Sequence, residues 1–291
     1  MNNLTDITVI KDIADRYGFS FSKRFGQNFL INPAISPKMA SLAGLGTDGV
    51  DFVLEIGPGI GTLTRELSKN AKKVVAVEID KRLIPVLEET LLGYDNINII
   101  NDDIMKLDLK RLIQTHFGDN KIAVCANLPY YITSPVIMRL LENNLPISSV
   151  TAMVQKEAGV RICTPPGTRE TGAITIAARY YSTPKILFSV KRGSFMPAPN
   201  VDSCVIKLDL REEAYLSGED QDLFFKIVRG AFSQRRKTLT NSLSTALNMK
   251  KEDIIQILKD INLGESLRPE QLKLEDFLEV TKKFTERTAL V

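Results

Sequence analysis

Four consecutive residues, Asn127, Leu128, Pro129 and Tyr130, are suited to holding a flat base that carries an amino group. The asparagine oxygen is a neutral hydrogen-bond acceptor for an amine that need not be deprotonated outright. Pro129 biases Leu128 toward an extended backbone, so the Leu128 carbonyl can face a ligand instead of starting a helix. The tyrosine ring can stack on a planar heterocycle. We therefore predict that these residues form a catalytic clamp for an exocyclic amine.

The apolar run Ile122–Ala126 just before the clamp predicts a buried strand. Ligands of open α/β folds bind where such strands end. An incidental turn after a strand would explain an isolated Asn and Pro at this place, whereas the whole tetrapeptide favours a site. The clamp is therefore expected at the carboxyl edge of an α/β sheet.

A glycine-rich turn, Gly57-Pro58-Gly59-Ile60-Gly61, follows a strand predicted over Val50–Glu55. Glycines let a backbone approach a ligand closely at the start of a helix. This pattern occurs in dinucleotide-binding enzymes and in methyltransferases. The acid Glu55 before the turn favours a methyltransferase. Arg65-Glu66 continue the helix where a dehydrogenase would need another glycine, which argues against that class.

A second acid, Glu78, ends the predicted strand Val74–Glu78, roughly twenty residues after the glycine turn, where a carboxylate hydrogen-bonds ribose hydroxyls. We predict this role for Glu78. Asp80 is predicted to cap the next helix, and Pro85 indicates that this helix starts late or kinks. Ser134 and Pro135 predict the N-cap and the first residue of the helix after the clamp.

The chain resembles the ribosomal RNA adenine dimethyltransferase family (the KsgA type). The resemblance rests on N-L-P-Y at the clamp, the E-x-G-x-G-x-G turn and three further strings: K-R-F-G-Q-N-F-L over 23–30, F-x-P-x-P-x-V-D-S over 195–203, and A-F-x-Q-R-R-K-T over 231–238. It runs from about Phe21 to about Leu243. One departure is Tyr131, where the family often has Asn.

The resemblance implies S-adenosylmethionine as methyl donor and adenosine in small-subunit ribosomal RNA as acceptor. Two adjacent adenosines in a 3′-terminal hairpin of 16S RNA would each be dimethylated during ribosome biogenesis. Acceptors from Asn127 and Leu128 would favour the partly positive nitrogen of the transition state, so no strong base is required.

Residue roles also follow from the resemblance. Asp103, after the predicted strand Ile97–Ile100, would contact the adenine of the donor, with Asp102 as the alternative; no third ligand suggests a metal there. The expected cofactor-binding residues are Asn28, Leu30, Gly57, Gly59, Glu78, Asp103 and Asn127. The expected substrate-binding residues are Tyr130, Phe195, Lys23, Arg24, Arg235, Arg236 and Lys237.

Two domains are predicted. Residues 1–210 form the catalytic domain, expected as the Rossmann-like, mostly parallel seven-stranded sheet of class I S-adenosylmethionine-dependent methyltransferases. Residues 211–291 show helical apolar spacing, which predicts a small all-helical domain, and the resemblance implies that this domain binds RNA. The basic run in this part suits phosphate contacts.

Composition sets the remaining expectations. The chain has 291 residues, a net charge of +3, 44% hydrophobic residues and three widely spaced cysteines. No signal peptide or membrane-spanning run is evident. We expect a cytoplasmic, monomeric enzyme whose partner is the 30S pre-ribosomal particle.

Two alternatives are a 23S RNA adenine dimethyltransferase of the macrolide-resistance type and an RNA-binding ribosome-assembly factor with secondary catalysis. The long Phe195 loop and the string Gln234–Thr238 count against the first. The intact clamp and glycine turn count against the second.

Overall fold

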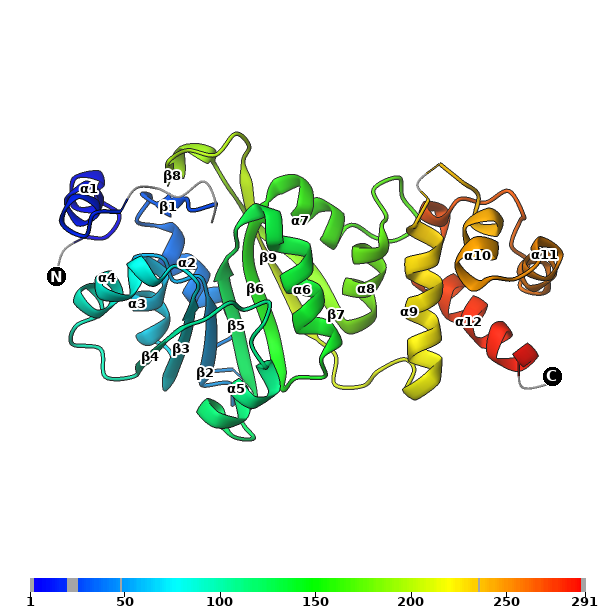
Figure 1. Cartoon of the computed structure of the whole chain (residues 1–291), viewed down its shortest axis with the longest axis horizontal. Coiled ribbons are helices and arrows are strands. Elements are labelled where there is room, and N and C mark those ends of the chain that lie inside the picture. The colour runs from blue at the N-terminus through cyan, green and yellow to red at the C-terminus, as the bar shows by residue number, and fades with distance from the viewer. Residues whose placement is uncertain (1–2, 20–25, 48, 235, 289–291) are drawn as a thin grey trace. The chain divides into compact units, whose positions relative to one another are not determined.

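The computed structural model describes residues 3–19, 26–47, 49–234 and 236–288, and its main feature is a seven-stranded sheet (Figure 1). The strand order is β4-β3-β2-β5-β6-β9-β7. Strands β2 to β6 pair in parallel, and β9 runs antiparallel to β6. The bounds are β2 Phe52–Ile56, β3 Lys73–Glu78, β4 Ile97–Asn101, β5 Ile122–Asn127, β6 Ile147–Gln155, β7 Ser182–Val190 and β9 Ser203–Leu210.

The strand order reverses between β2 and β5, which are neighbours in the sheet but not in the sequence. In open α/β sheets the crevice at such a switch point is the usual ligand site. The glycine turn follows β2, and the clamp follows β5. The topology therefore brings the two strongest sequence signals to one crevice.

Helices cover both faces of the sheet. Val53, Cys125 and Met153 share a buried cluster with Met39 of α2 and Leu67 of α3. On the opposite face, the Phe117 ring at the end of α5 meets Phe52 edge-on at 5.9 Å. The helices around the sheet are α2 Ile35–Leu42, α3 Thr62–Ser68, α4 Ile84–Thr90, α5 Leu109–Phe117, α6 Thr133–Glu142 and α7 Lys156–Cys163, with short 3₁₀ turns at Lys81–Leu83, Tyr130–Ile132 and Arg192–Ser194.

The N-terminal helix α1, Ile7–Arg16, lies outside the sheet and packs toward α4. Its Ile10 and Ile13 share an apolar cluster with Phe29 and with Ile60 of the glycine turn. Arg16 also forms a bidentate ion pair with Glu89, at 2.6 and 2.8 Å. An exposed pair of this kind is screened by solvent and contributes little, whereas each fully buried isoleucine contributes about 1.5–3 kcal/mol. The apolar cluster therefore holds α1 in place.

A two-stranded antiparallel ribbon joins distant parts of the chain. Strand β1, Phe29–Leu30, pairs with β8, Phe195–Met196, so that Leu30 lies opposite Phe195. Residues 26–30, which we call the strap, lead into this ribbon. The pairing brings the strap to the same region as the glycine turn, where the would-be Cβ of Gly59 lies 3.2 Å from the Phe29 ring.

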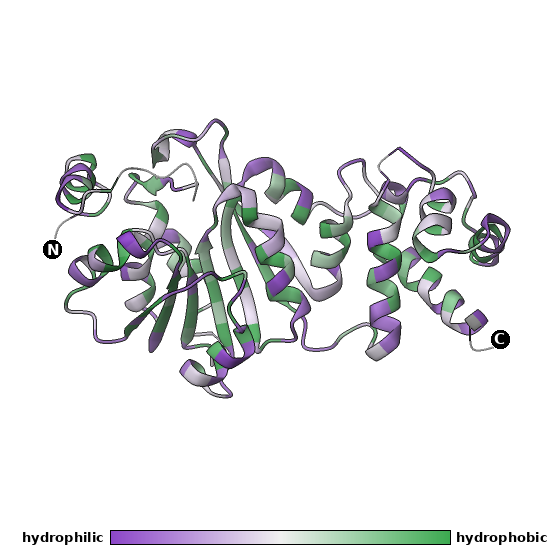
Figure 2. Cartoon of the chain, in the orientation of Figure 1, coloured by the Kyte–Doolittle hydropathy of each residue, from purple (hydrophilic) through white to green (hydrophobic). Residues whose placement is uncertain are grey.

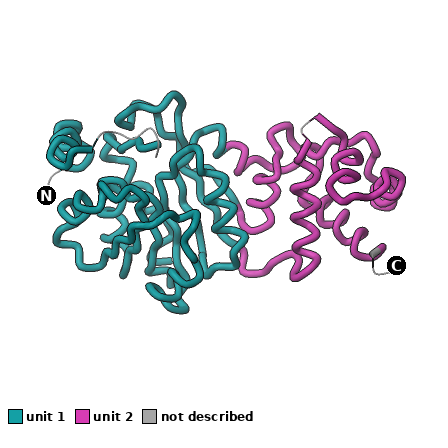
Figure 3. Tube along the Cα trace, viewed as in Figure 1, with its two compact units in different colours: residues 1–159, 184–210 teal, residues 160–183, 211–291 magenta. Residues whose placement is uncertain are grey.

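Two compact units emerge from the contacts, residues 1–159 with 184–210, and residues 160–183 with 211–291 (Figure 3). The second contains α8 Ala173–Tyr181, α9 Gly218–Phe232, α10 Leu239–Leu247, α11 Lys251–Asp260, a 3₁₀ turn at Pro269–Gln271 and α12 Leu274–Thr288. Apolar side chains such as Phe224, Leu243 and Phe277 are buried in its core. Figure 2 shows apolar stretches, in green, alternating with polar ones along these helices. Grouping 160–183 with the helices differs from the predicted division at residue 210.

Two predicted helix starts have different outcomes. Asp80 accepts a hydrogen bond from the Arg82 amide as the cap of a 3₁₀ turn, and α4 begins only at Ile84, as Pro85 indicated. The predicted Ser134 N-cap is wrong, because α6 continues directly from the 3₁₀ turn after the clamp and begins at Thr133 without a side-chain cap.

Candidate active site

A pocket opens at the carboxyl ends of β2, β3 and β5, with a cavity of about 230 Å³. Its walls come from the strap, the glycine turn, the ends of β3 and β4, and the clamp. The predicted site residues that line it are Asn28, Leu30, Gly57, Gly59, Glu78, Asp103, Asn127, Leu128, Pro129 and Tyr130. All the expected cofactor-binding residues are therefore brought to one cavity.

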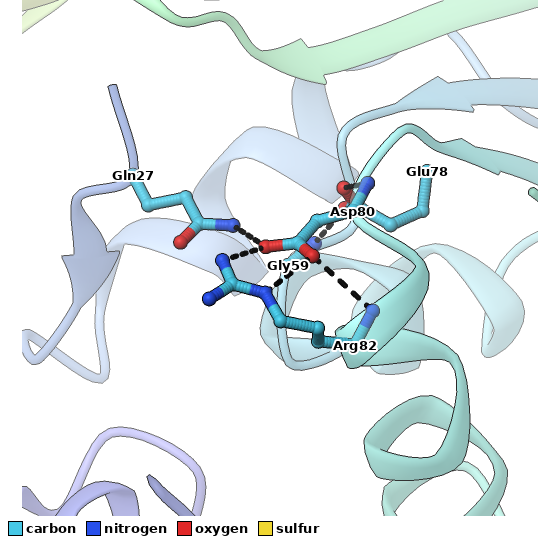
Figure 4. Close-up of polar contacts among 5 residues, drawn as sticks. All are labelled: Gln27, Gly59, Glu78, Asp80 and Arg82. Atoms are coloured by element: carbon cyan, nitrogen blue, oxygen red, sulfur yellow. Dashed lines mark hydrogen bonds and ion pairs between the residues drawn. The ribbon is translucent and has the colours of Figure 1, made fainter. Parts of the chain in front are cut away.

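Figure 4 shows Glu78 beside Asp80 and Gly59, whose backbone amides hold its carboxylate. Its Oε1 accepts from the Asp80 amide at 2.8 Å and its Oε2 from the Gly59 amide at 3.2 Å. Burial raises the Glu78 pKa to about 7, although these two backbone donors oppose the shift. Glycine is needed at 59 because its φ is +61° and a side chain would meet the Phe29 ring. The carboxylate is thus positioned where β3 ends, as the sequence predicted.

Glu55 is the most unusual side chain of the pocket. It is 1% exposed, and neither carboxylate oxygen has a hydrogen-bond partner among the described residues. The nearby Thr64 hydroxyl partly offsets the effect of burial on the pKa of Glu55, but it forms no hydrogen bond of ordinary geometry with the carboxyl group. Burial, with a smaller contribution from the Glu78 charge, raises the Glu55 pKa to about 8. The ligand-free protein therefore holds a neutral carboxyl group beneath the pocket at neutral pH.

The replacement Glu55→Gln should stabilise the ligand-free protein increasingly as the pH rises. A carboxyl whose pKa rises on folding from 4.5 to about 8 contributes stability below pH 4.5 and loses that contribution as the pH approaches 8. Gln cannot ionise, so the variant should exceed the wild type by several kcal/mol at high pH, since each pKa unit corresponds to about 1.4 kcal/mol. Urea unfolding at several pH values measures this.

The exposed Glu88 provides the control for this comparison, because Glu88→Gln makes the same replacement on the surface of α4, outside the pocket. A stability difference between Glu55→Gln and the wild type that is the same at every pH would show that Glu55 does not titrate in this range.

Asn127 is held so that its oxygen is available. Its Nδ2 group donates to the Asn28 carbonyl of the strap at 3.3 Å. In the described part of the chain no donor is bonded to its Oδ1 or to the Leu128 carbonyl, while the Leu128 amide donates to Met153 at 3.1 Å. Pro129 is extended, with ψ of 133°. Two neutral acceptors are thus free beside the pocket, which is the arrangement expected of the clamp.

The two tyrosines of the clamp region differ in their surroundings. The Tyr130 hydroxyl is 2.7 Å from the Ser203 hydroxyl, so its half-buried ring is fixed. Tyr131 is 59% exposed at the rim and lies beside Gly26 of the strap. Sequence reasoning missed the contribution of Ser203, although this residue ends the string over 195–203.

Phe195 does not line the pocket. It is 3% exposed and packs with Leu30 and Val190 in the core behind the strap. The cause is the pairing of β8 with β1, which turns this ring inward. The expectation that Phe195 stacks on a base therefore needs correction: in this structure its ring supports the strap.

Asp103 and the basic residues complete the predicted set. Asp103 Oδ1 accepts from the Met105 amide at 2.9 Å, and the neighbouring Asp102 is exposed. Arg236 and Lys237 are exposed in the turn between α9 and α10. Lys23, Arg24 and Arg235 lie outside the described residues.

The described residues contain neither a metal-binding cluster nor a membrane-spanning helix. No group of three His, Cys, Asp or Glu side chains there could hold a metal ion. None of the helices in that part of the chain is long and apolar enough to cross a membrane.

Comparison with known proteins agrees with this geometry. The family model described as ribosomal RNA adenine dimethylase matches residues 18–286. The chain belongs to this family. Family membership confirms the enzyme class predicted from the sequence, a ribosomal RNA adenine dimethyltransferase. Curated relatives named ribosomal RNA small subunit methyltransferase A include those of Clostridioides difficile, 44% identical over 95% of both chains, and Macrococcus caseolyticus, 44% identical over 100% of this chain and 99% of the relative.

Solved structures support the fold of this dimethylase. A dimethyladenosine transferase from Plasmodium falciparum is 28% identical, with a TM-score of 0.74 over 89% of this chain and 98% of that one. The 23S rRNA methyltransferase ErmE is 25% identical, with a TM-score of 0.68 over 89% of this chain and all of that one. The predicted fold class, a mostly parallel seven-stranded methyltransferase sheet followed by helices, is confirmed.

Proposed function

We propose that this dimethylase takes its methyl groups from S-adenosylmethionine and transfers them to the exocyclic amine of adenosines in small-subunit ribosomal RNA. The target is two adjacent adenosines in a 3′-terminal hairpin of 16S RNA, each dimethylated during ribosome biogenesis. The observation that carries the proposal is the pairing of a ribose-type carboxylate, Glu78, with the free acceptors of Asn127 and Leu128 in one pocket.

The residues of the pocket fit a nucleoside that carries positive charge. Glu78 presents a carboxylate where β3 ends, the position at which such folds bind ribose hydroxyls. Glu55 leaves two buried oxygens without partners, and a cationic ligand would offset the cost of ionising it. Gly57, whose φ is +71°, brings the backbone of the turn to the pocket without a side chain.

When bound, the donor supplies a methyl carbon on a positively charged sulfur. Asn127 Oδ1 and the Leu128 carbonyl would accept from the two hydrogens of the adenine amine. This raises electron density on the nitrogen and favours its pyramidal, partly positive form over the flat ground state. Tyr130, fixed by Ser203, would support the base by stacking. The alkylated ammonium loses its proton readily, so the described residues need supply no strong base.

The target must leave its stack or already be unpaired to reach this pocket. The same amine accepts two methyl groups, so the monomethyl product must rotate about its C–N bond and bind again. The exposed Tyr131 stands at the rim through which the base would enter.

The ribosomal subunit is assigned from the curated relatives, which are named for the small subunit, whereas ErmE, a 23S enzyme, is 25% identical. Ribosomal RNA from cells with and without the gene, digested and analysed by mass spectrometry, tests the assignment. We expect dimethyladenosine to disappear from the small-subunit fraction of the deletion strain. Its loss from the large-subunit fraction alone would favour the macrolide-resistance type.

The exposed pair Arg236 and Lys237 would contact RNA phosphates. Replacing both with Glu should weaken binding of a small-subunit RNA hairpin and reduce the magnitude of the slope of log K against log salt by about 1.4–1.8, because each lost phosphate contact removes about 0.7–0.9. Titrations at several salt concentrations measure the slope. The matched control is the replacement of Lys250 and Lys251, an exposed pair at the start of α11, by Glu. An equal loss in both double variants would mean that only net charge matters.

The setting of the enzyme is also part of the proposal. We infer that it acts in the cytoplasm, as a monomer, on the 30S pre-ribosomal particle. Its three cysteines are free, two of them buried, which suits a reducing compartment.

A further inference from the structure

Asp80 is bonded far more extensively than a helix cap requires. Its side chain is 4% exposed. Oδ1 accepts from the Arg82 amide at 3.2 Å and from Arg82 Nε at 2.9 Å, and Oδ2 accepts from Arg82 Nη2 at 2.6 Å. The fourth donor is Gln27 Nε2, 2.9 Å from Oδ2, and it comes from the strap (Figure 4). Burial opposes ionisation, but these donors outweigh it and hold the Asp80 pKa below its usual range.

The backbone of the same residue positions the ribose carboxylate. The Asp80 amide donates to Glu78 Oε1 at 2.8 Å, opposite the Gly59 amide on Oε2. Asp80 thus contacts Glu78 through its main chain and Gln27 through its side chain. One residue joins the floor of the pocket to the strap.

The strap also reaches the clamp. The residue after Gln27 is Asn28, whose carbonyl accepts from Asn127 Nδ2 at 3.3 Å. The next residue, Phe29, is anchored in the apolar cluster of α1. The strap is therefore held at three successive residues. Phe29 packs in the apolar cluster, Asn28 bonds the clamp, and Gln27 bonds Asp80 on the β3 side of the pocket.

We propose that Gln27 and Asp80 are positioning residues whose hydrogen bond fastens the strap to the loop that follows Glu78, so that strap and carboxylate enclose a bound nucleoside as one unit. This inference rests on the proposed function, because it assigns the pocket to a nucleoside donor. The proposal gives Gln27 a role separate from that of Asn28. The Gln27 side chain bonds the loop that follows Glu78 and so fixes the distance between the strap and the floor of the cavity.

The test compares Gln27→Ala with the wild type by two measurements. In the ligand-free protein, hydrogen exchange of the amides of residues 28–31 should rise about tenfold, as expected when a hydrogen bond to a charged group is lost from a local opening. In calorimetric titrations, the Kd for S-adenosylmethionine should rise by about the same factor. In assays with RNA the loss should appear in KM for the donor more than in kcat. Gln27→Glu, which places a second carboxylate beside Asp80, should exceed Gln27→Ala in both measurements.

Gln256→Ala is the matched control. Gln256 Nε2 donates to the Asp260 carboxylate at 2.8 Å, so the variant removes a hydrogen bond of the same kind from the exposed surface of α11. It should change neither the exchange of residues 28–31 nor the Kd. Unchanged exchange in Gln27→Ala would overturn the proposal. Faster exchange with an unchanged Kd would also overturn it, because the strap would then not be coupled to the nucleoside site. If the wild type itself fails to bind the donor, the proposed function fails, while the exchange comparison still decides whether the tie exists.

Discussion

Replacing Asn127 with Ala should lower kcat for methyl transfer by about 100-fold or more, with a much smaller effect on donor binding. Its Oδ1 is a free acceptor beside the pocket, and a preorganised polar group aimed at charge that develops in the transition state typically accounts for about 10²–10³ in kcat. Single-turnover assays with saturating donor and a small-subunit RNA fragment measure the chemical step directly.

Asn70→Ala provides the control, since Asn70 also donates its side-chain amide to a carbonyl, that of Glu66, but on an exposed helix end. It should leave kcat unchanged. A variant Asn127→Ala that keeps its full single-turnover rate would exclude the acceptor role, and the Leu128 carbonyl would then have to act alone.

Replacing Glu78 with Ala should raise the Kd for the donor by about 100-fold or more. Two ribose hydroxyls would lose a charged acceptor, and hydrogen bonds to charged groups contribute about 1.5–3 kcal/mol each. Isothermal titration calorimetry with S-adenosylmethionine measures the loss. The RNA affinity of the same variant should be unchanged, which separates a defect in the donor site from misfolding.

The pH dependence of binding adds a sharper check on Glu78. Its pKa is raised to about 7 in the ligand-free protein, and only the ionised form accepts from two hydroxyls. Donor affinity should therefore fall as the pH drops below 7 and level off above it. Glu78→Gln should flatten that limb of the profile; a limb of the same steepness in the variant would assign the titration to another group, with Glu55 the first candidate.

Local patterns were enough to predict the parts of the site that lie in single loops. The glycine turn follows β2 directly, Glu78 ends β3, and the clamp begins at the last residue of β5, so strand prediction alone brings them to one sheet edge. The late start of α4 could be predicted from Pro85 because proline acts on its own backbone.

Contacts between distant segments could not be predicted in this way. Phe195 is buried because a two-residue strand pairs with the strap more than 160 residues earlier, and two residues carry no periodicity. The Tyr130–Ser203 and Gln27–Asp80 bonds likewise join segments 73 and 53 residues apart. The resemblance marked Gln27 and Ser203 as members of family strings, but only the fold shows what they touch.

Helix α1 makes no contribution to the sheet, yet its Ile10 and Ile13 share an apolar cluster with Phe29 and Ile60, both of which line the pocket. Truncation of the protein at Gly18 would strip apolar cover from the back of the strap and of the glycine turn together. The smallest catalytic fragment must therefore include α1 as well as the sheet and the helices that cover it. Substitutions in α1 should change donor affinity even though no residue of this helix lines the pocket.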